Sequence, residues 1–192
     1  MLSINHLSFS YGKKKVLENL DLTLERGELL AVMGPSGCGK STLLHLIAGL
    51  RKPSGGTLEN RAERLSYVFQ EPRLFPWLTL GENLRAVLSD KADAGERIWE
   101  ALRMVELSES AVLYPSQLSG GMKIRASLAR ALAFGGDLFL LDEPFSALDE
   151  ALCRELCKKL RDYFKAHGIS AILVTHRTED AQAFADRIFQ MS

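Results

Sequence analysis

Apolar side chains in the first part of the chain are spaced as in β-strands, with one helical stretch among them. The run 17–25 alternates cleanly, with Leu20, Leu22 and Leu24 separated by polar residues, which is typical of a strand with one buried face. A cluster of proline and glycine further on predicts an interruption. The expected elements are strands at 2–10, 17–25, 28–33 and 65–69, a helix from about 40 to 50, and a break at 53–56.

In the middle of the chain the apolar spacing becomes helical, and no strand pattern interrupts it. Leu80, Leu84 and Leu88 fall on one helix face. Thr79 and Ser119 are suitable N-caps for two of the helices. We therefore predict an all-helical insert in a larger α/β domain. The expected helices are 79–89, 94–107 and 119–133; the insert covers 77–117, and the core consists of 1–76 and 118–192.

Strands and helices alternate again in the last third of the chain. Residues 137–141 form a nearly continuous apolar run, as expected for a central parallel strand buried on both faces. These patterns together predict an α/β fold with a sheet core, an antiparallel β subdomain and the helical insert. The remaining expected elements are strands at 170–175 and 187–191 and helices at 150–166 and 178–186.

A glycine-rich loop joins the strand 28–33 to the helix that follows it. Residues 34–41 read G-P-S-G-C-G-K-S and match the phosphate-binding motif G-x-x-x-x-G-K-[ST], with the strand and helix that this motif requires on either side. The glycines let backbone N–H groups point at a polyphosphate, while Lys40 can reach the β- and γ-phosphates and Ser41 can ligate Mg²⁺. The core is therefore predicted to be of the P-loop NTPase type. The expected ATP-binding residues are Gly34, Pro35, Ser36, Gly37, Cys38, Gly39, Lys40, Ser41 and Thr42.

Two acidic residues, Asp142 and Glu143, follow the apolar run 138–141. A carboxylate at the C-terminal end of a central strand lies where open α/β sheets bind ligands. Asp142 can hold Mg²⁺, and Glu143 can orient and deprotonate an attacking water. A polar strand end before a turn explains the same residues when they are taken alone, but the upstream phosphate loop favours nucleotide chemistry.

Ser119, Gly120 and Gly121 open a predicted helix with two residues of poor helix propensity. Their N–H groups make a second candidate anion site, although a capped helix with a glycine entry is the simpler interpretation. P-loop kinases and GTPases have no need of such an element. The stretch 118–122 therefore distinguishes this chain from P-loop kinases and GTPases.

Composition argues against several classes of function and site. Lys+Arg and Asp+Glu both number 24, so no net positive charge draws the chain to nucleic acid or anionic lipid. We expect neither a signal peptide nor a membrane-spanning run. The three cysteines are not expected to form disulfides, and Cys38 is given no catalytic role. Cys153 and Cys157 share a helix face without another ligand at metal-site spacing and are interpreted as core residues.

In order and spacing, these motifs resemble those of the nucleotide-binding subunits of ATP-binding cassette (ABC) transporters, from Ser3 to Phe189. The phosphate loop matches the Walker A motif, 138–143 the Walker B strand, and 118–122 the signature motif. By the same resemblance, further roles fall on Tyr11 (adenine stacking), Gln70 (metal and water), 146–149 (the D-loop) and His176 (the switch histidine).

Some positions depart from the family pattern. Met122 stands where the family usually has Gln, and 123–125 read K-I-R in place of a commoner R-Q-R. Met122 and the sequence Q-E-P-R-L-F-P-W at 70–77 resemble the nitrate, sulfonate and taurine importer branch, and thiamine-precursor importers are similar here. The chain ends in a strand after His176, where relatives continue, so a C-terminal regulatory domain is expected to be absent.

The resemblance implies an ATPase in which two copies sandwich two ATP molecules in an ATP-bound homodimer. The Walker A loop of one copy would face the signature amides of the other across the γ-phosphate, with Mg²⁺ as cofactor. The implied catalytic residues are Glu143, His176 and Gln70, the residues that bind ATP in trans are Ser119, Gly120 and Gly121, and the Mg²⁺ ligands are Ser41, Gln70 and Asp142.

The same resemblance implies integral-membrane permease subunits as partners, and indirectly a solute-binding protein, with no nucleic acid. The expected contact surface is the helical insert with 75–78. The location implied is cytoplasmic, on the inner face of the cell membrane, and the cargo a small anionic or heterocyclic solute.

Two other hypotheses stay open. A soluble ABC ATPase acting on nucleic acid or the ribosome tends to be larger and to carry coiled coils or tandem cassettes. A nucleotide switch without hydrolysis is disfavoured by the presence of Glu143 and His176. Of the tryptophans, Trp77 is expected either at an interface or in the core, and Trp99 in the core of the insert. The other histidines, His6, His45 and His167, are interpreted as surface or core residues without ligands.

Overall fold

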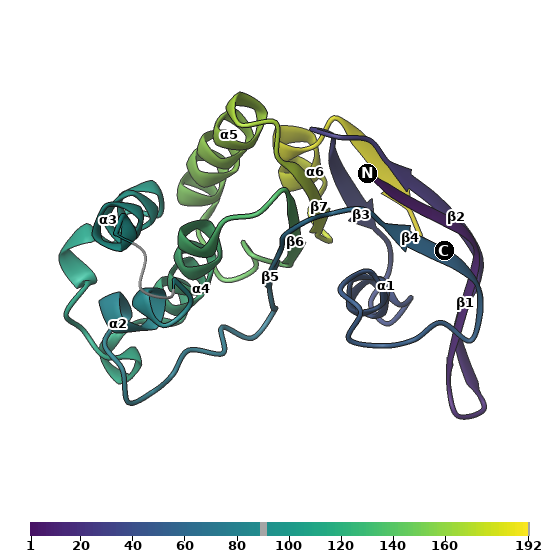
Figure 1. Ribbon diagram of the computed structural model, residues 1–192, viewed down its shortest axis with the longest axis horizontal. Helices are drawn as coiled ribbons and strands as arrows, with labels where there is room; N and C mark the ends of the chain where they lie inside the picture. Colours follow the sequence, from purple (N-terminus) through teal and green to yellow (C-terminus); the bar gives the residue numbers. More distant parts are fainter. Residues whose placement is uncertain (89–91, 192) are drawn as a thin grey trace.

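Two sheets organise the computed structural model, which describes residues 1–88 and 92–191 (Figure 1). Five strands form an all-parallel sheet in the order β5-β6-β7-β3-β8, and three form an antiparallel sheet in the order β2-β1-β4. The parallel strands are β3 (Leu29–Met33), β5 (Leu65–Val68), β6 (Leu138–Asp142), β7 (Ser170–Val174) and β8 (Arg187–Gln190). The antiparallel strands are β1 (Leu2–Tyr11), β2 (Lys14–Leu24) and β4 (Gly55–Asn60).

Each central parallel strand supplies side chains to two separate cores, because successive residues of a strand point to opposite faces. In β6, Phe139 and Leu141 belong to one core, while Leu138 and Leu140 belong to the other. Both faces are therefore covered, as the continuous apolar run predicts. The first core contains most of the helices, and the second contains α1 and the antiparallel sheet.

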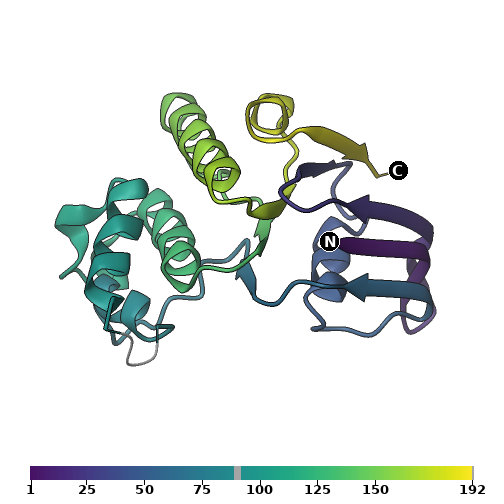
Figure 2. The ribbon, with the colours of Figure 1, turned by 45° about the horizontal axis from the view of Figure 1, so that its top comes forward.

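Helices fill the first core in two groups (Figure 2). One group lies directly on the parallel sheet, and the other extends away from it on the far side of α4. Among the described residues, no helix combines the length and apolarity needed to cross a bilayer. The helices are α1 (Lys40–Ile47), α2 (Leu80–Arg85), α3 (Ala94–Met104), α4 (Gly120–Phe134), α5 (Glu150–Ala166) and α6 (Thr178–Phe184), with short 3₁₀ turns at Ser108–Ser110 and Pro115–Gln117.

The predicted α/β class and its helices and strands are confirmed, with ends that differ by a few residues. Thr79 and Ser119 cap α2 and α4 as predicted: each side-chain oxygen accepts a hydrogen bond from the N–H three residues on, at 3.3 and 3.2 Å. Residue 89, the end of the predicted 79–89 helix, lies outside the described residues. The 77–117 boundary of the insert stays a prediction.

Two predictions about the fold are wrong. The expected break at 53–56 holds only for 53–54, because Gly55 and Gly56 already belong to β4, whose glycine-rich, half-exposed sequence carries little strand signal. Gly56 takes a left-handed φ of 80°, and a Cβ there would lie 2.3 Å from the His6 carbonyl oxygen, so the glycine serves a close strand pairing. Trp99, expected in the core, is 55% exposed, because the buried face of α3 consists of Ala94, Ala101 and Leu102.

Candidate nucleotide site

The phosphate loop occupies the turn between β3 and α1. Gly37 and Gly39 have φ values of 82° and 103°, which L-side chains rarely adopt. A Cβ on Gly39 would also lie within 2.9 Å of the side chains of Leu17 and Val16 in β2. The loop is therefore pressed against the antiparallel sheet, and it leads directly into the N-terminus of α1, a position suited to an anion.

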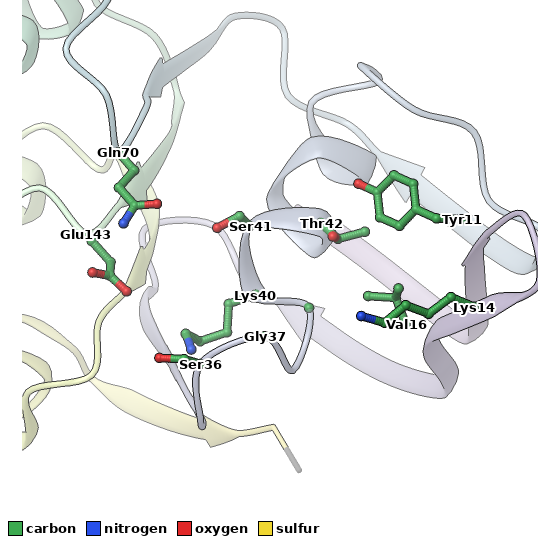
Figure 3. Close-up of a pocket in the computed structure, with 11 residues that line it drawn as sticks. Tyr11, Lys14, Val16, Ser36, Gly37, Lys40, Ser41, Thr42, Gln70 and Glu143 are labelled. Atoms are coloured by element: carbon green, nitrogen blue, oxygen red, sulfur yellow. The ribbon is translucent and has the colours of Figure 1, made fainter.

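The loop forms one wall of a cleft of about 350 Å³ (Figure 3). Strands β1 and β2 form a second wall, and Gln70 and Glu143, at the ends of β5 and β6, form a third. Figure 3 shows Gln70 and Glu143 extending toward Ser41 and Lys40. The lining residues are Tyr11, Lys14, Val16, Ser36, Gly37, Gly39, Lys40, Ser41, Thr42, Gln70 and Glu143.

Lys40 supplies a cation on the loop side of this cleft. Its ammonium donates to the carbonyl oxygens of Gly34 and Pro35, at 2.7 and 2.9 Å, and its side chain is largely buried. These bonds keep the charge close to the loop amides. A polyphosphate lying along the loop would thus meet N–H donors and an ammonium together.

Asp142 provides a carboxylate beside the loop, at the end of β6. The Ser41 hydroxyl donates to it at 3.1 Å, and the Tyr67 hydroxyl lies 3.5 Å away. Burial raises the pKa of Asp142, the Ser41 hydrogen bond opposes this shift, and the neighbouring charge of Glu143 adds to it. A buried carboxylate and a hydroxyl side by side are the hard oxygen ligands that Mg²⁺ prefers, so these residues fit that ion.

Glu143 and His176 lie together at the ends of β6 and β7. The Glu143 carboxylate is 3.4 Å from His176 Nδ1, and the Glu143 side chain is 20% exposed. Its backbone has a left-handed φ of 49°, a conformation that costs a non-glycine residue about 1 kcal/mol or more. Such strain is typical of functional positions, and here it accompanies a carboxylate that reaches the cleft.

The start of α4 lies outside this cleft. Ser119 and Gly120 are exposed, whereas Leu118 is buried. A Cβ on Gly121 would approach the Ala147 carbonyl oxygen and a methyl group of Leu148 to 3.2 Å, so this helix start packs closely against the loop 146–149. The helix N-terminus is therefore open to a ligand that arrives from outside the chain.

The structure thus brings most of the predicted nucleotide residues into one place. Three predicted loop residues do not line the cleft, namely Gly34, Pro35 and Cys38, and Asp142 and His176 lie beside it. Tyr11 lines the cleft while 42% exposed, with the Arg51 guanidinium 4.7 Å from its ring centre. Sequence reasoning missed Lys14 and Tyr67. Local sequence carried no signal for Tyr67, because Tyr67 reaches Asp142 through the pairing of β5 with β6, in which Tyr67 lies opposite Leu140.

Comparisons with known proteins agree with this geometry. Residues 17–146 match the family described as ABC transporter. The aliphatic sulfonates import ATP-binding protein SsuB 1 of Pseudomonas savastanoi pv. phaseolicola is 42% identical over 95% of this chain and 76% of its own length. The sulfate/thiosulfate import ATP-binding protein CysA of Caulobacter vibrioides is 39% identical over 97% of this chain and 60% of its own length.

Solved structures show the same fold. A dimeric bacterial ABC transporter cassette superposes with a TM-score of 0.91 at 30% identity, covering 100% of this chain and 94% of its own. A cassette dimer in a post-hydrolysis state, bound to ADP and phosphate, gives 0.89 with the same coverage and identity.

Proposed function

This chain belongs to the ABC transporter family, and we propose that it is the ATP-hydrolysing subunit of an importer for a small solute. The observation that carries the proposal is the convergence of the phosphate loop, Gln70 and Glu143 on one cleft, with Asp142 bonded to Ser41 at its edge. The named relatives serve import of sulfonates, sulfate or thiosulfate. We therefore infer a small anionic solute as cargo.

Each side chain has a place in the reaction. ATP lies along the loop amides with its phosphates near Lys40, and Tyr11 stacks on the adenine. A water attacks the γ-phosphorus, Glu143 accepts its proton, and ADP and phosphate are the products. His176 and Gln70 orient the water and the γ-phosphate. Ser41, Asp142 and Gln70 would hold Mg²⁺, which supplies neutralisation of the phosphate charge.

A second copy completes the site. The residues Ser119, Gly120 and Gly121 do not line the cleft of their own chain, yet the first two are exposed. In a closed dimer they bind the γ-phosphate held by the partner copy. Release of phosphate removes this bridge, so hydrolysis opens the dimer. The similarity to a cassette solved as a dimer supports this arrangement.

The permease contact lies on the segment after Gln70. Phe75 and Trp77 are 39% and 70% exposed, and their rings lie 5.7 Å apart. An exposed aromatic pair is a suitable anchor for a protein partner. We propose that this surface docks on integral-membrane permease subunits at the inner face of the membrane, and that a solute-binding protein delivers the cargo to them.

Capture from detergent-solubilised membranes tests the proposal. The tagged chain should retain a permease, and Trp77→Ala should weaken that capture severalfold. Ile188→Ala is the control, since Ile188 is also an exposed apolar residue but lies on β8, outside the helical insert and the segment 75–78. Capture of ribosomes or nucleic acid in place of a permease would support the soluble ABC ATPase hypothesis and overturn the importer assignment.

A further inference from the structure

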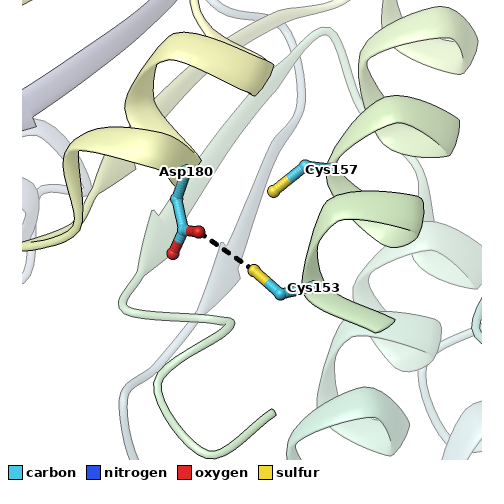
Figure 4. Close-up of side chains that lie close together, drawn as sticks. All are labelled: Cys153, Cys157 and Asp180. Atoms are coloured by element: carbon cyan, nitrogen blue, oxygen red, sulfur yellow. Dashed lines mark hydrogen bonds between the residues drawn. The ribbon is translucent and has the colours of Figure 1, made fainter. Parts of the chain in front are cut away.

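Two cysteines and an aspartate meet in the interior, away from the nucleotide cleft (Figure 4). Cys153 and Cys157 project from successive turns of α5, and Asp180 projects toward them from the first turn of α6. Their relative exposures are 1%, 0% and 4%. One ligand atom from each residue lies within 4.8 Å of the other two. The fold thus supplies the third ligand that sequence spacing around the cysteines lacks.

The charge of Asp180 is weakly compensated for so buried a group. Its Oδ1 accepts a hydrogen bond from the Cys153 thiol, a poor donor, at 3.0 Å, and its ion pair with the Arg177 guanidinium is long, at 3.7 Å. A buried carboxylate is costly unless it is paired or coordinated. The cluster therefore combines one carboxylate charge with two sulfur atoms, and the three ligand atoms lie within 4.8 Å of one another.

We propose that Cys153, Cys157 and Asp180 bind one thiophilic divalent cation, with zinc as the best match. Two thiolates and a carboxylate form a set of ligands typical of zinc sites. The formal charges also balance, because the cation and Arg177 offset two thiolates and one carboxylate.

Thiol chemistry selects among cations. A cation must displace the protons of both thiols to bind, because the thiolate and not the thiol is the metal ligand. Mg²⁺ and Ca²⁺ prefer oxygen ligands and do not meet that requirement, whereas zinc forms strong thiolate bonds. The site is thereby distinct from the oxygen ligands Ser41 and Asp142.

Helices α5 and α6 connect the proposed metal site to the nucleotide cleft. Helix α5 begins at Glu150, directly after the loop 146–149, whose last residue, Asp149, is its N-cap, and α6 begins two residues after His176. A cation bound between these helices fixes the start of α6 relative to α5. It should therefore stabilise the loop that carries His176, which is adjacent to Glu143.

Cobalt binding to the chelator-treated full chain tests the proposal, since Co²⁺ reports thiolate ligation by a near-ultraviolet charge-transfer band. We expect one Co²⁺ per chain, displaced by Zn²⁺, and loss of the band in the Cys153→Ser/Cys157→Ser variant. Cys38→Ser is the matched control, because Cys38 lies in the phosphate loop, and it should keep the band. No band in the wild type, or a band that survives in the double variant, overturns the site.

A second measurement uses only the wild-type chain and so does not depend on folding of a variant. X-ray absorption of the zinc-loaded protein should show two sulfur ligands at about 2.3 Å with the remainder oxygen or nitrogen. Zinc should also raise the melting temperature of the wild type in a concentration-dependent way. A shell without sulfur, or with one sulfur only, refutes the proposal.

Discussion

Replacing Glu143 by glutamine tests the hydrolytic chemistry with little change in shape. Glutamine has the same length and can keep the 3.4 Å contact to His176, but it cannot accept a proton from water. The side chain is only 20% exposed, so bulk water replaces the lost base poorly. Removal of a positioned base slows reactions by about 10²–10⁴-fold; a tenfold change is about 1.36 kcal/mol, so the midpoint of 10³ is about 4 kcal/mol.

ATP binding should respond to Glu143→Gln differently from the rate of ATP hydrolysis. Glu143 is a like charge beside Asp142 and raises the pKa of that carboxyl, so its neutralisation lowers this pKa and favours the ionised ligand. We expect ATP affinity in the presence of Mg²⁺ to be maintained or increased. Without hydrolysis the closed dimer should accumulate.

Two assays follow these effects: phosphate release for the rate, and light scattering with ATP for the dimer. Glu109→Gln, the same substitution at an exposed residue of the 3₁₀ turn Ser108–Ser110, is the control and should behave as the wild type. Hydrolysis above a tenth of the wild-type rate in Glu143→Gln, or no ATP-dependent dimer, would refute the role given to Glu143.

Three further predictions concern the loop, the signature helix and pH. Lys40→Ala removes the ammonium beside the phosphates and should weaken ATP binding about tenfold or more by calorimetry; unchanged affinity would contradict the phosphate-loop assignment. Gly121→Ala places a methyl 3.2 Å from the 146–149 loop and should cost about 1–3 kcal/mol in thermal unfolding, whereas Gly120→Ala, with open space around it, should cost less; equal costs would refute the contact. Because its pKa is raised, Asp142 should become protonated at a pH above the ordinary aspartate range, and Mg²⁺-dependent hydrolysis should be lost there. Ser41→Ala removes a hydrogen bond that lowers this pKa, so it should move the acid limb of the pH–rate profile to higher pH. A shift to lower pH would contradict the assignment.

Local sequence signals predict much of this fold because most elements carry their own pattern. The run 138–141 is apolar throughout because β6 is buried on both faces, and Thr79 and Ser119 mark helix starts by chemistry that acts within three residues. Strand β4 is different. It is held by pairing with β1, and its own glycine-rich sequence contains little of that information.

The residues of the two sites likewise divide into those that local sequence identifies and those that only the fold brings together. The phosphate loop is contiguous, so the spacing of its residues identifies it in the sequence. Asp142 and Glu143 are identified by their position directly after an apolar strand. Tyr67 approaches Asp142 only through the pairing of β5 with β6, and Asp180 reaches the cysteines only through the packing of α6 on α5. Trp99 was misplaced because it follows Ile98 by one residue, which turns it out of the half-buried face of α3.

The central claim is that the start of α4 in one copy closes over the phosphate loop of another. The native Cys38 allows this to be measured in the Glu143→Gln chain with Ser119→Cys added, because Cys153 and Cys157 are buried. Isotope-labelled and unlabelled copies are mixed with ATP, treated with a short bifunctional maleimide, and analysed by mass spectrometry. The account predicts an ATP-dependent link between residue 119 of one copy and Cys38 of the other. A link confined to single chains, or one that forms equally without ATP, would contradict it.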